Sequence, residues 1–594
     1  MEFEQKAEEK KISMSKNIAR LAVTAGLTAA LSFGGVMAPA TMAFAAGTPT
    51  VATGGNVKID EKTYKDTTFK GIQIFKAKVT QNYDGSAWSG DKTLSDIDWA
   101  SLDVMSVVTG AFTGVAEAPA ANAGAQAWAK YIKDNAGNKV GQTAKVDAGS
   151  TLDKIAAALE GSTLTWTNPG DSSKGDFKAL NTGYWLFVTA NVGSTTSSDS
   201  ANGNTDAYTS PIFTVVGGED VKAEPKKDVP NVTKAVKDDA VDGTFGTFEN
   251  PNKAADSQMG DYVDYLLTGT VASNINTYST YKYTFTDELP KSMTPKFKDG
   301  STTPDVTVKI GDTEVKTDCY TAKYVNDKIT VDFTDLKNCT DESGNSIVLN
   351  SGSKVTVEYK AKLDSTKIFE NGKIKDEFKG LVGKAQKNKV TLTYSNNPHA
   401  EGVGTTVEHP AYDYTYGIDV TKVGSDDETK GLKGVEFTLQ EQGDTNKFIM
   451  ANGVKTTDEA KAKLTTDDSG KLNVVGLDEG TYVLTEVTPA PGYNNSAANG
   501  VTFTIKRDLN QNGDDVTPSA DSAINAANGV VKNNSATAST GKLSFIIVDQ
   551  QGSGLPLTGL NGVTFTWIAG GAVLCIGVAH LIRSRKQAEE SEQE

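Results

Sequence analysis

Apolar and polar residues alternate strictly over the central third of the chain. Large apolar residues occupy every second position in three segments: 281–285, 355–359 and 390–394. A period of two puts alternate side chains on one face of a pleated strand, so these segments predict half-buried antiparallel strands. Shorter runs of the same kind recur between turn residues from Tyr416 to about residue 550. The pattern predicts two β-sandwich domains in tandem, 232–410 and 411–550.

Residues 46–217 combine two periodicities. Strand-like runs lie at 71–79, 183–190 and 210–216. Two further segments, 125–133 and 151–160, carry apolar residues at helical spacing and predict short helices. Residues 218–231 contain two prolines and predict an extended linker. The chain is therefore expected to be mainly β, with immunoglobulin-like sandwich domains in a rod and short helices in the N-terminal domain.

Composition narrows the functional classes. The 594 residues contain 75 Asp+Glu against 59 Lys+Arg, a net charge of −16 that argues against nucleic acid as a partner. Three His and three Cys, with no HExxH or CxxC spacing, leave little for a metal site. There is no Walker A loop, no GxGxxG between a strand and a helix, and no GxSxG. We therefore expect that the protein is not an enzyme and that it binds no cofactor.

Both ends of the chain look like targeting signals. Basic residues precede an apolar stretch at 21–37 and the small-x-small sequence Ala43-Phe44-Ala45, so residues 1–45 predict a cleaved signal peptide, with a membrane anchor as the alternative. Near the other end, an apolar run at 563–582 is long enough to cross a bilayer and is followed by a basic tail. Five residues stand just before that run: Leu555, Pro556, Leu557, Thr558 and Gly559.

This order, LPxTG, apolar span and basic tail over residues 551–594, resembles the cell-wall sorting signal of Gram-positive surface proteins. The resemblance implies that a sortase cleaves between Thr558 and Gly559 and transfers the Thr558 carbonyl to an amine. The alternative is an ordinary membrane anchor behind a chance pentapeptide.

Two lysines share the strand face of apolar neighbours. Lys234 has the parity of Val232 and Val236, and Lys422 has the parity of Ile418 and Val420. Both side chains should therefore point into a sandwich. A buried amine is costly unless it is paired or neutral, and a neutral amine is a nucleophile.

Electrophiles and acids occur in phase on other strands. Asn396 continues the apolar face of 390–394, and Asp549 that of 545–547, with Asn397, Asn533 and Asn534 as alternatives. Asp287 follows Phe285 in phase, with Asp261 and Asp264 nearby, and Glu486 follows Leu484. Each predicted sandwich therefore offers a lysine, an acid and a carboxamide or carboxyl group.

This combination resembles the Cna-type sandwich domains of sortase-assembled pilins, which form Lys–Asn or Lys–Asp isopeptide bonds without an enzyme. Residues 482–493 look like the E-box of that family, whose Glu assists the bond. The resemblance implies a Lys422–Asp549 bond assisted by Glu486 and a Lys234–Asn396 bond assisted by Asp287. The family usually has Asn where Asp549 stands.

The linker residues 220–227 resemble, in part, the pilin motif of the same family, with Glu224 in place of its tyrosine. The resemblance implies that Lys226, or else Lys227, is the amine that accepts Thr558 of another subunit. Pro225 should hold this segment extended. The alternative is an ordinary basic linker.

Cys319 and Cys339 lie on a chain expected to be exported, and a disulfide between them is predicted. Cys575 falls in the apolar run, and His399, His409 and His580 suggest no site.

The whole resemblance implies the major shaft subunit of a pilus, secreted and covalently attached to the cell wall, that supports adhesion. Its expected partners are a class C pilin sortase, a housekeeping sortase, identical subunits, minor pilins, peptidoglycan and a host receptor, and not nucleic acid. The alternatives are a monomeric wall-anchored adhesin, which needs no acceptor lysine, and a minor basal pilin.

Overall fold

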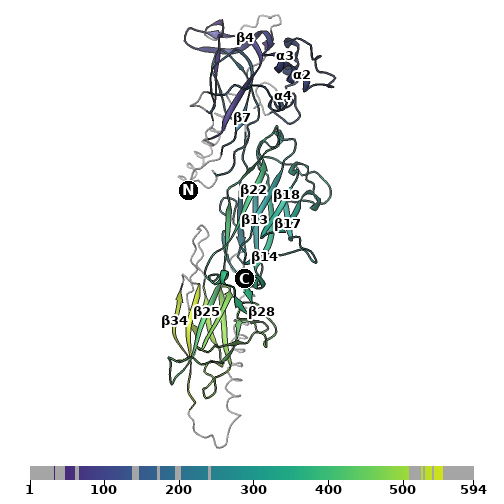
Figure 1. The fold of residues 1–594 in the computed structure, drawn as a ribbon. Helices are drawn as coiled ribbons and strands as arrows, with labels where there is room; N and C mark the ends of the chain where they lie inside the picture. The colour runs from purple at the N-terminus through teal and green to yellow at the C-terminus, as the bar shows by residue number, and fades with distance from the viewer. Residues whose placement is uncertain are drawn as a thin grey trace, which may run out of the picture.

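Three groups of β-sheets follow one another along the chain and lie end to end, which makes the molecule elongated (Figure 1). We call them the N-terminal module (β1–β9), the middle module (β10–β24) and the C-terminal module (β25–β35). The computed structural model describes residues 32–33, 47–60, 66–136, 146–169, 174–193, 203–225, 227–238, 243–506, 524–525, 529–537 and 541–552. The predicted mainly β fold, with tandem sandwich domains in a rod, is confirmed.

The N-terminal module combines two sheets with three helices. The larger sheet contains, in spatial order, β1 (Ser32–Phe33), β5 (Trp88–Trp99), β4 (Thr68–Tyr83), β7 (Gly183–Asn191) and β8 (Ile212–Val216), with β2 (Thr48–Val51) also paired to β4. The smaller sheet contains β6 (Asp176–Leu180), β3 (Gly55–Ile59) and β9 (Val221–Ala223). The helices are α2 (Leu102–Gly110), α3 (Ala125–Asp134) and α4 (Thr151–Glu160).

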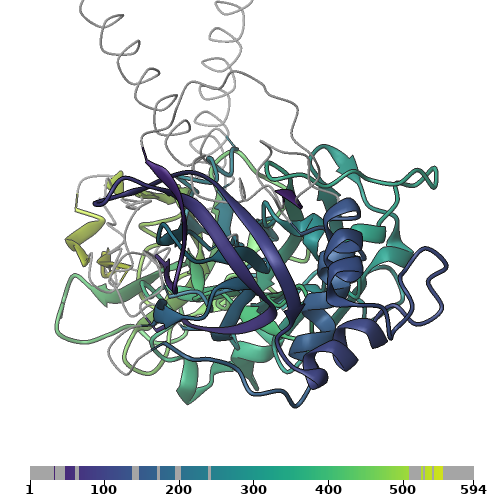
Figure 2. The same ribbon diagram turned by 90° about the horizontal axis from the view of Figure 1, so that it is seen from above.

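The helices lie to one side of the larger sheet (Figure 2). Trp128 of α3 and Leu152 of α4 are buried in one core with Ile74 and Leu186 of the sheet. Both predicted helices and the three predicted strand regions are confirmed, whereas α2 had not been expected. Strand β9 pairs with β3, so part of the predicted linker belongs to this module.

The middle module is a sandwich of two large sheets. One contains β10 (Val232–Lys237), β12 (Val263–Thr270), β19 (Lys354–Leu363), β15 (Val306–Ile310) and β16 (Thr313–Glu314), with β14 (Met293–Pro295) on β19. The other contains β11 (Ala254–Asp256), β24 (His409–Tyr414), β22 (Gln386–Ser395), β13 (Tyr283–Glu288), β18 (Lys328–Phe333) and β17 (Thr321–Val325), with β23 (Val403–Thr405) on β22.

Short elements complete this module: η1 (Ile275–Thr277), η2 (Thr317–Cys319), η3 (Leu336–Asn338), α5 (Ser365–Ile368), the β20–β21 hairpin (Phe369–Glu370, Lys373–Ile374) and η4 (Asp376–Phe378). The alternating residues 281–285, 355–359 and 390–394 meet in its core, as their period predicted. Strand β24 pairs with β22, and its last residue, Tyr414, pairs with β11 of the same sheet. The middle module therefore extends beyond residue 410, its predicted end. We place that limit at Thr415.

The C-terminal module also has two facing sheets. One contains β30 (Lys471–Leu477), β25 (Tyr416–Gly424), β35 (Lys542–Asp549) and β34 (Val531–Thr537). The other contains β29 (Leu464–Thr465), β26 (Glu436–Glu441), β31 (Gly480–Thr488), β32 (Val501–Ile505) and β33 (Ile524–Asn525), and β27 (Phe448–Ile449) pairs with β28 (Lys455–Thr456) beside them. The first and last strands, β25 and β35, are parallel neighbours.

Hydrogen bonds join the modules at both junctions. At the first junction, residues 203–210 of the N-terminal module lie against the middle module, where Thr205 N–H donates to Thr405 O (2.8 Å) and Tyr208 N–H donates to Asn396 O (2.7 Å). At the second, the Tyr416 hydroxyl donates to Asp256 Oδ2 (2.6 Å). The modules therefore contact each other through fixed polar partners.

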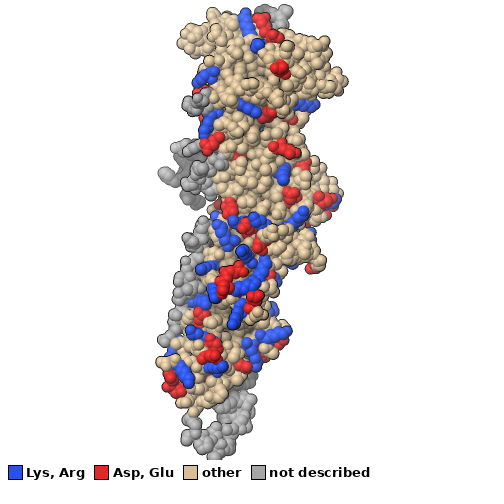
Figure 3. Space-filling view, viewed as in Figure 1, with Lys and Arg blue, Asp and Glu red and all other residues tan. Residues whose placement is uncertain are grey.

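The face drawn in Figure 3 carries basic and acidic side chains side by side over the middle and C-terminal modules. No helix among the described residues is long and apolar enough to cross a membrane. The predicted span 563–582, like nearly all of the predicted signal peptide, lies outside the described residues.

Candidate functional site

In the C-terminal module, three ionisable side chains from three strands meet in the core. Lys422 Nζ on β25 donates to Glu486 Oε2 on β31 (2.9 Å) and also contacts Asp549 Oδ1 on β35. Lys422 and Asp549 are completely buried, and Glu486 is 2% exposed. The parity argument placed all three side chains correctly, because each continues the inward face of its strand.

The electrostatics of this site favour the neutral form of the Glu486 carboxyl. Burial raises the pKa of the Glu486 carboxyl to about 7, because desolvation outweighs the attraction of Lys422. Ser496 N–H donates to Asp549 Oδ1 (3.1 Å), while Asp549 Oδ2 and Glu486 Oε1 have no hydrogen-bond partner among the described atoms. A protonated Glu486 beside a neutral Lys422 would suit condensation of the amine with Asp549.

The middle module holds a second buried lysine. Lys234 Nζ on β10 donates to Asp287 Oδ2 on β13 (2.5 Å) and to the Tyr359 hydroxyl on β19 (2.9 Å). Both side chains of the ion pair are fully buried. Asp261 and Asp264, the alternative acids, instead pair with Lys455 (3.1 Å) and Lys360 (2.7 Å).

The carboxamide beside this lysine belongs to Asn388, not to Asn396. Asn388 Nδ2 on β22 donates to the Tyr359 hydroxyl (2.7 Å), the same oxygen that Lys234 contacts. Asn396 lies beyond the other end of β22 and donates to Asp206 O of the N-terminal module (3.1 Å). Asn397 Oδ1 accepts from His399 N–H (3.0 Å). The choice of Asn396 as partner of Lys234 is therefore corrected to Asn388.

Sequence parity could have found Asn388. Buried positions recur at 388, 390, 392 and 394 along β22, so Asn388 shares the inward face as fully as Asn396 does. Asn396 continues the same face at the other end of the strand, away from Lys234. Strand β22 is antiparallel to β13, and Val390 pairs with Asp287, which brings Asn388 to the end where Lys234 lies.

Burial also shifts the pKa values of the two ionisable groups of the middle site, Lys234 and Asp287. Desolvation lowers the pKa of the Lys234 ammonium to about 8, against the opposing attraction of Asp287. Desolvation raises the pKa of the Asp287 carboxyl, although Lys234 and Tyr359 stabilise its charged form. Both shifts bring the pair closer to its neutral form, an amine beside a carboxylic acid.

Only one of the two linker lysines lies among the described residues. Lys226 lies outside the described residues. Lys227 is ion-paired with Asp206, and their side chains are only 8% and 0% exposed. Thr67 Oγ1 donates to the same Asp206 oxygen (2.5 Å). The alternative acceptor, Lys227, is thus a buried residue of the first junction, which argues against its attack on a bulky acyl-enzyme.

The predicted disulfide is absent. Cys319 and Cys339 are free thiols. Cys319 Sγ accepts from Thr340 N–H (3.2 Å), and Cys339 Sγ lies 3.9 Å from Asp335 O, so each sulfur has a local polar contact. Burial raises the pKa of the Cys339 thiol.

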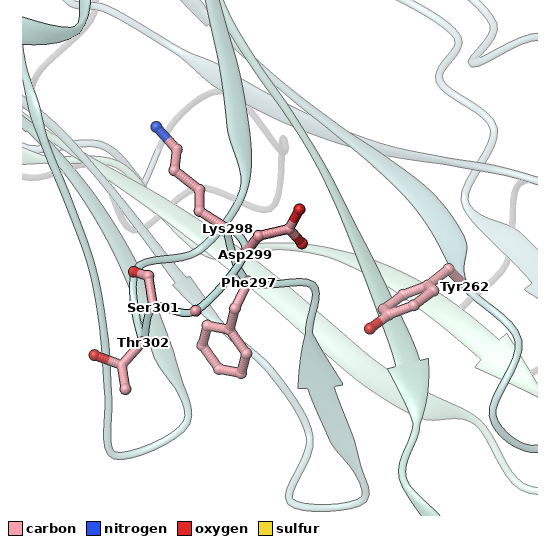
Figure 4. Close-up of a pocket in the computed structure, with 7 residues that line it drawn as sticks. Tyr262, Phe297, Lys298, Asp299, Ser301 and Thr302 are labelled. Carbon is pink, nitrogen blue, oxygen red and sulfur yellow. The ribbon is translucent and has the colours of Figure 1, made fainter.

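Three further points concern groups other than the two lysine sites. Residues 555–559 and the side chains of Asn533 and Asn534 fall outside the described part of the chain. Within that part, no three His, Cys, Asp or Glu side chains are grouped as metal ligands. A shallow hollow of about 800 Å³ lies on the middle module, where Tyr262 and Phe297 come from separate segments (Figure 4). It contains neither of the buried lysines.

Residues 417–517 match the family model described as SpaA, prealbumin-like fold domain. The match covers most of the C-terminal module and includes Lys422 and Glu486. The chain is thus a mainly β protein of tandem sandwich modules, the last of which contains a prealbumin-like domain. No curated protein matches it.

Several solved structures have a similar arrangement. The T6 backbone pilin of serotype M6 Streptococcus pyogenes is 14% identical with a TM-score of 0.47, over 86% of this chain and 100% of that one. The full-length major pilin SpaD of Corynebacterium diphtheriae is 18% identical with a TM-score of 0.42, over 84% and 98%. RrgB of Streptococcus pneumoniae is 14% identical with a TM-score of 0.39, over 72% and 97%.

Proposed function

We propose that this chain is the major structural subunit of a covalent, cell-wall-anchored pilus whose modules are stiffened by self-formed amide bonds. The observation that carries the proposal is the pair of buried lysine sites. Each lysine stands on the first strand of its sandwich, and its partner stands on a strand near or at the end of the same module. Such pairs would tie the two ends of a module together.

In the C-terminal module the reaction is a condensation. A neutral Lys422 amine attacks Cγ of the protonated Asp549 carboxyl, the new N–C bond replaces a C–O bond, and water leaves. Glu486 supplies a proton to the departing oxygen and recovers one from the Lys422 nitrogen, so it is unchanged at the end. Its raised pKa, about 7, suits this exchange near neutral pH.

In the middle module the same attack falls on Asn388, and ammonia leaves. The neutral Lys234–Asp287 pair needed for this step arises when the lysine proton moves to Asp287, over the 2.5 Å contact between them. The low polarity of the surroundings favours that transfer, because it removes two buried charges.

The benefit of the bonds is mechanical. A sandwich held by noncovalent forces alone is only marginally stable and can be pulled open. Because β25 and β35 are parallel neighbours, a Lys422–Asp549 amide would pass tension from one to the other and bypass the remaining strands. The end-to-end arrangement of the modules suits a shaft under tension (Figure 1).

Assembly would use the sorting motif at 555–559 and the linker between the first two modules. Thr558 would be transferred by a class C pilin sortase to Lys226 of the next subunit, and a housekeeping sortase would join the finished polymer to peptidoglycan. Lys226 is preferred over Lys227 because the latter is buried against Asp206. Adhesion, through minor pilins or a host receptor, would follow from display on the surface.

The test is the mass of the intact chain. Each amide lowers the mass, by about 18 Da for Lys422–Asp549 and about 17 Da for Lys234–Asn388. We expect Lys422→Ala and Lys234→Ala each to abolish one deficit, while Lys433→Ala, at an exposed lysine (72%), leaves both. An unmodified wild-type mass would refute the amide bonds.

Polymerisation is tested separately, in a cell that supplies the sortases. Lys226→Ala should abolish the ladder of covalent multimers and leave the amide deficits intact. Persistence of the ladder would refute Lys226 as acceptor, and a wild-type chain that never forms a ladder would favour a monomeric wall-anchored adhesin.

A further inference from the structure

The Tyr359 hydroxyl is hydrogen-bonded to each of the other three polar side chains of the middle site. It donates to Asp287 Oδ2 (2.7 Å), and it accepts from Lys234 Nζ (2.9 Å) and from Asn388 Nδ2 (2.7 Å). The other oxygens of the site, Asp287 Oδ1 and Asn388 Oδ1, have no hydrogen-bond partner among the described atoms. No hydrogen bond between Asp287 and Asn388 is found within the described site, and the hydroxyl lies between them.

Among the described residues of the C-terminal site, no hydroxyl is found that bridges the acid and its partner in this way. There Glu486 contacts Lys422 directly, and the Lys422 ammonium also contacts Asp549. Aspartate is one methylene shorter than glutamate, so an acid on β13 reaches less far across the sandwich. In the middle module Asp287 also contacts Lys234 directly, and the Tyr359 hydroxyl lies between Asp287 and the Asn388 carboxamide.

We infer that Tyr359 is a catalytic residue of the middle site, whose hydroxyl relays a proton between Asp287 and the leaving nitrogen of Asn388. This inference rests on the proposed Lys234–Asn388 amide and names the group that completes it.

The relay balances as follows. After Asp287 has taken one proton from the Lys234 ammonium, the neutral amine attacks Cγ of Asn388. As the Cγ–Nδ2 bond breaks, the Tyr359 hydroxyl gives its proton to Nδ2 and receives the proton of Asp287. The attacking nitrogen returns one proton to Asp287. Ammonia leaves and an amide remains. Of the two protons that the lysine has lost, one is carried away in the ammonia and the other stays on Asp287, which ends as the neutral acid, while Tyr359 is unchanged.

The surroundings suit a hydroxyl that passes protons without becoming charged. Burial raises the pKa of Tyr359 well above its ordinary value, so the neutral hydroxyl persists. The Tyr265 ring stacks on the Tyr359 ring, with centroids 5.4 Å apart and 15° between planes, and holds it in place. A rigid ring keeps the hydroxyl within reach of all three partners.

The experiment follows the cross-linked peptide that contains Lys234 and Asn388, in digests of the full chain taken at intervals after synthesis. Tyr359→Phe should slow amide formation about 100-fold, the scale of a lost general acid. Tyr281→Phe is the matched control: Tyr281 is fully buried in the same core, and its hydroxyl has no partner among the described atoms. This control should react at the wild-type rate.

A double variant separates relay from packing. Asp287→Glu with Tyr359→Phe lengthens the acid into the space of the lost hydroxyl, and should restore most of the rate. If Tyr359→Phe alone does not fold, the rate of amide formation in the double variant tests the inference instead. A wild-type rate in folded Tyr359→Phe, or no amide in the folded double variant, would overturn the inference. A wild-type chain without the amide would instead refute the proposed function, and this inference with it.

Discussion

Lys422, on the first strand of the C-terminal module, contacts Asp549 on the last strand, and neither side chain is exposed to solvent. An ion pair in such a place pays a large desolvation cost, and its replacement by apolar residues is often neutral or stabilising. A covalent amide removes both charges. The proposed Lys422–Asp549 amide would therefore avoid the desolvation cost of a buried ion pair.

Replacement of Glu486 by Gln should stop that bond from forming. Glutamine keeps the shape but cannot exchange a proton, so the deficit of about 18 Da from the mass calculated for the sequence should disappear. Without the cross-link over a loop of about 127 residues (422 to 549), the module should lose about 5 kcal/mol of unfolding free energy. Mass spectrometry and thermal unfolding check both effects. Glu428→Gln, at an exposed carboxylate, is the control, and a full mass deficit in Glu486→Gln would contradict the assignment.

The two asparagines on the inward face of β22 should behave differently. Asn388→Ala should remove the deficit of about 17 Da from the middle module. Asn396→Ala should keep it, and should weaken only the first junction by about 1 kcal/mol through the lost bond to Asp206 O. Intact mass reads the first effect, and limited proteolysis between the modules reads the second. A lost deficit in Asn396→Ala would restore the original assignment.

The un-cross-linked middle module should become more stable as the pH rises above about 8. Burial depresses the folded-state pKa of the free Lys234 amine to about 8 from 10.5, and Asn388→Ala keeps that amine free. Between these values the unfolded chain binds a proton that the folded chain lacks, so the free energy of unfolding increases with pH, by roughly 3 kcal/mol over the window. Urea unfolding at pH 8 and pH 10 measures this.

The matched control for this pH effect is Asn388→Ala combined with Lys234→Met, which has no amine to titrate. Its stability should lack the same rise. Parallel pH profiles for the two variants would show that Lys234 keeps an ordinary pKa in the folded module.

Lys227 should matter for the folding of the first junction. Lys227→Met leaves the buried Asp206 carboxylate without its ion-pair partner, which should cost about 3–5 kcal/mol. Lys222→Met, at an exposed position on β9, should change little. Calorimetry of both variants checks the difference. Equal stability would mean that the Lys227–Asp206 pair contributes nothing to the junction.

The inward-facing residues were readable from the chain because side-chain direction in a strand is a local property. Lys234, Lys422, Glu486 and Asp549 each share the parity of buried apolar neighbours, and all four are buried in the structure. The period of two follows from backbone geometry alone and needs no knowledge of the partner strand. The period of two also predicted the sandwiches, and apolar residues at helical spacing predicted the two amphipathic helices.

Partners across the core depended on the tertiary structure. Asn388 and Asn396 have the same parity, yet only Asn388 shares a hydroxyl with Lys234, while Asn396 joins the first junction. Tyr359 likewise looked like one more core aromatic. Parity says which face a residue occupies but not how far along its strand the opposite sheet places its partner. The position of the partner along the strand depends on how the two sheets pack against each other. It also depends on residues 203–210 of the N-terminal module, which contact Asn396 and Thr405.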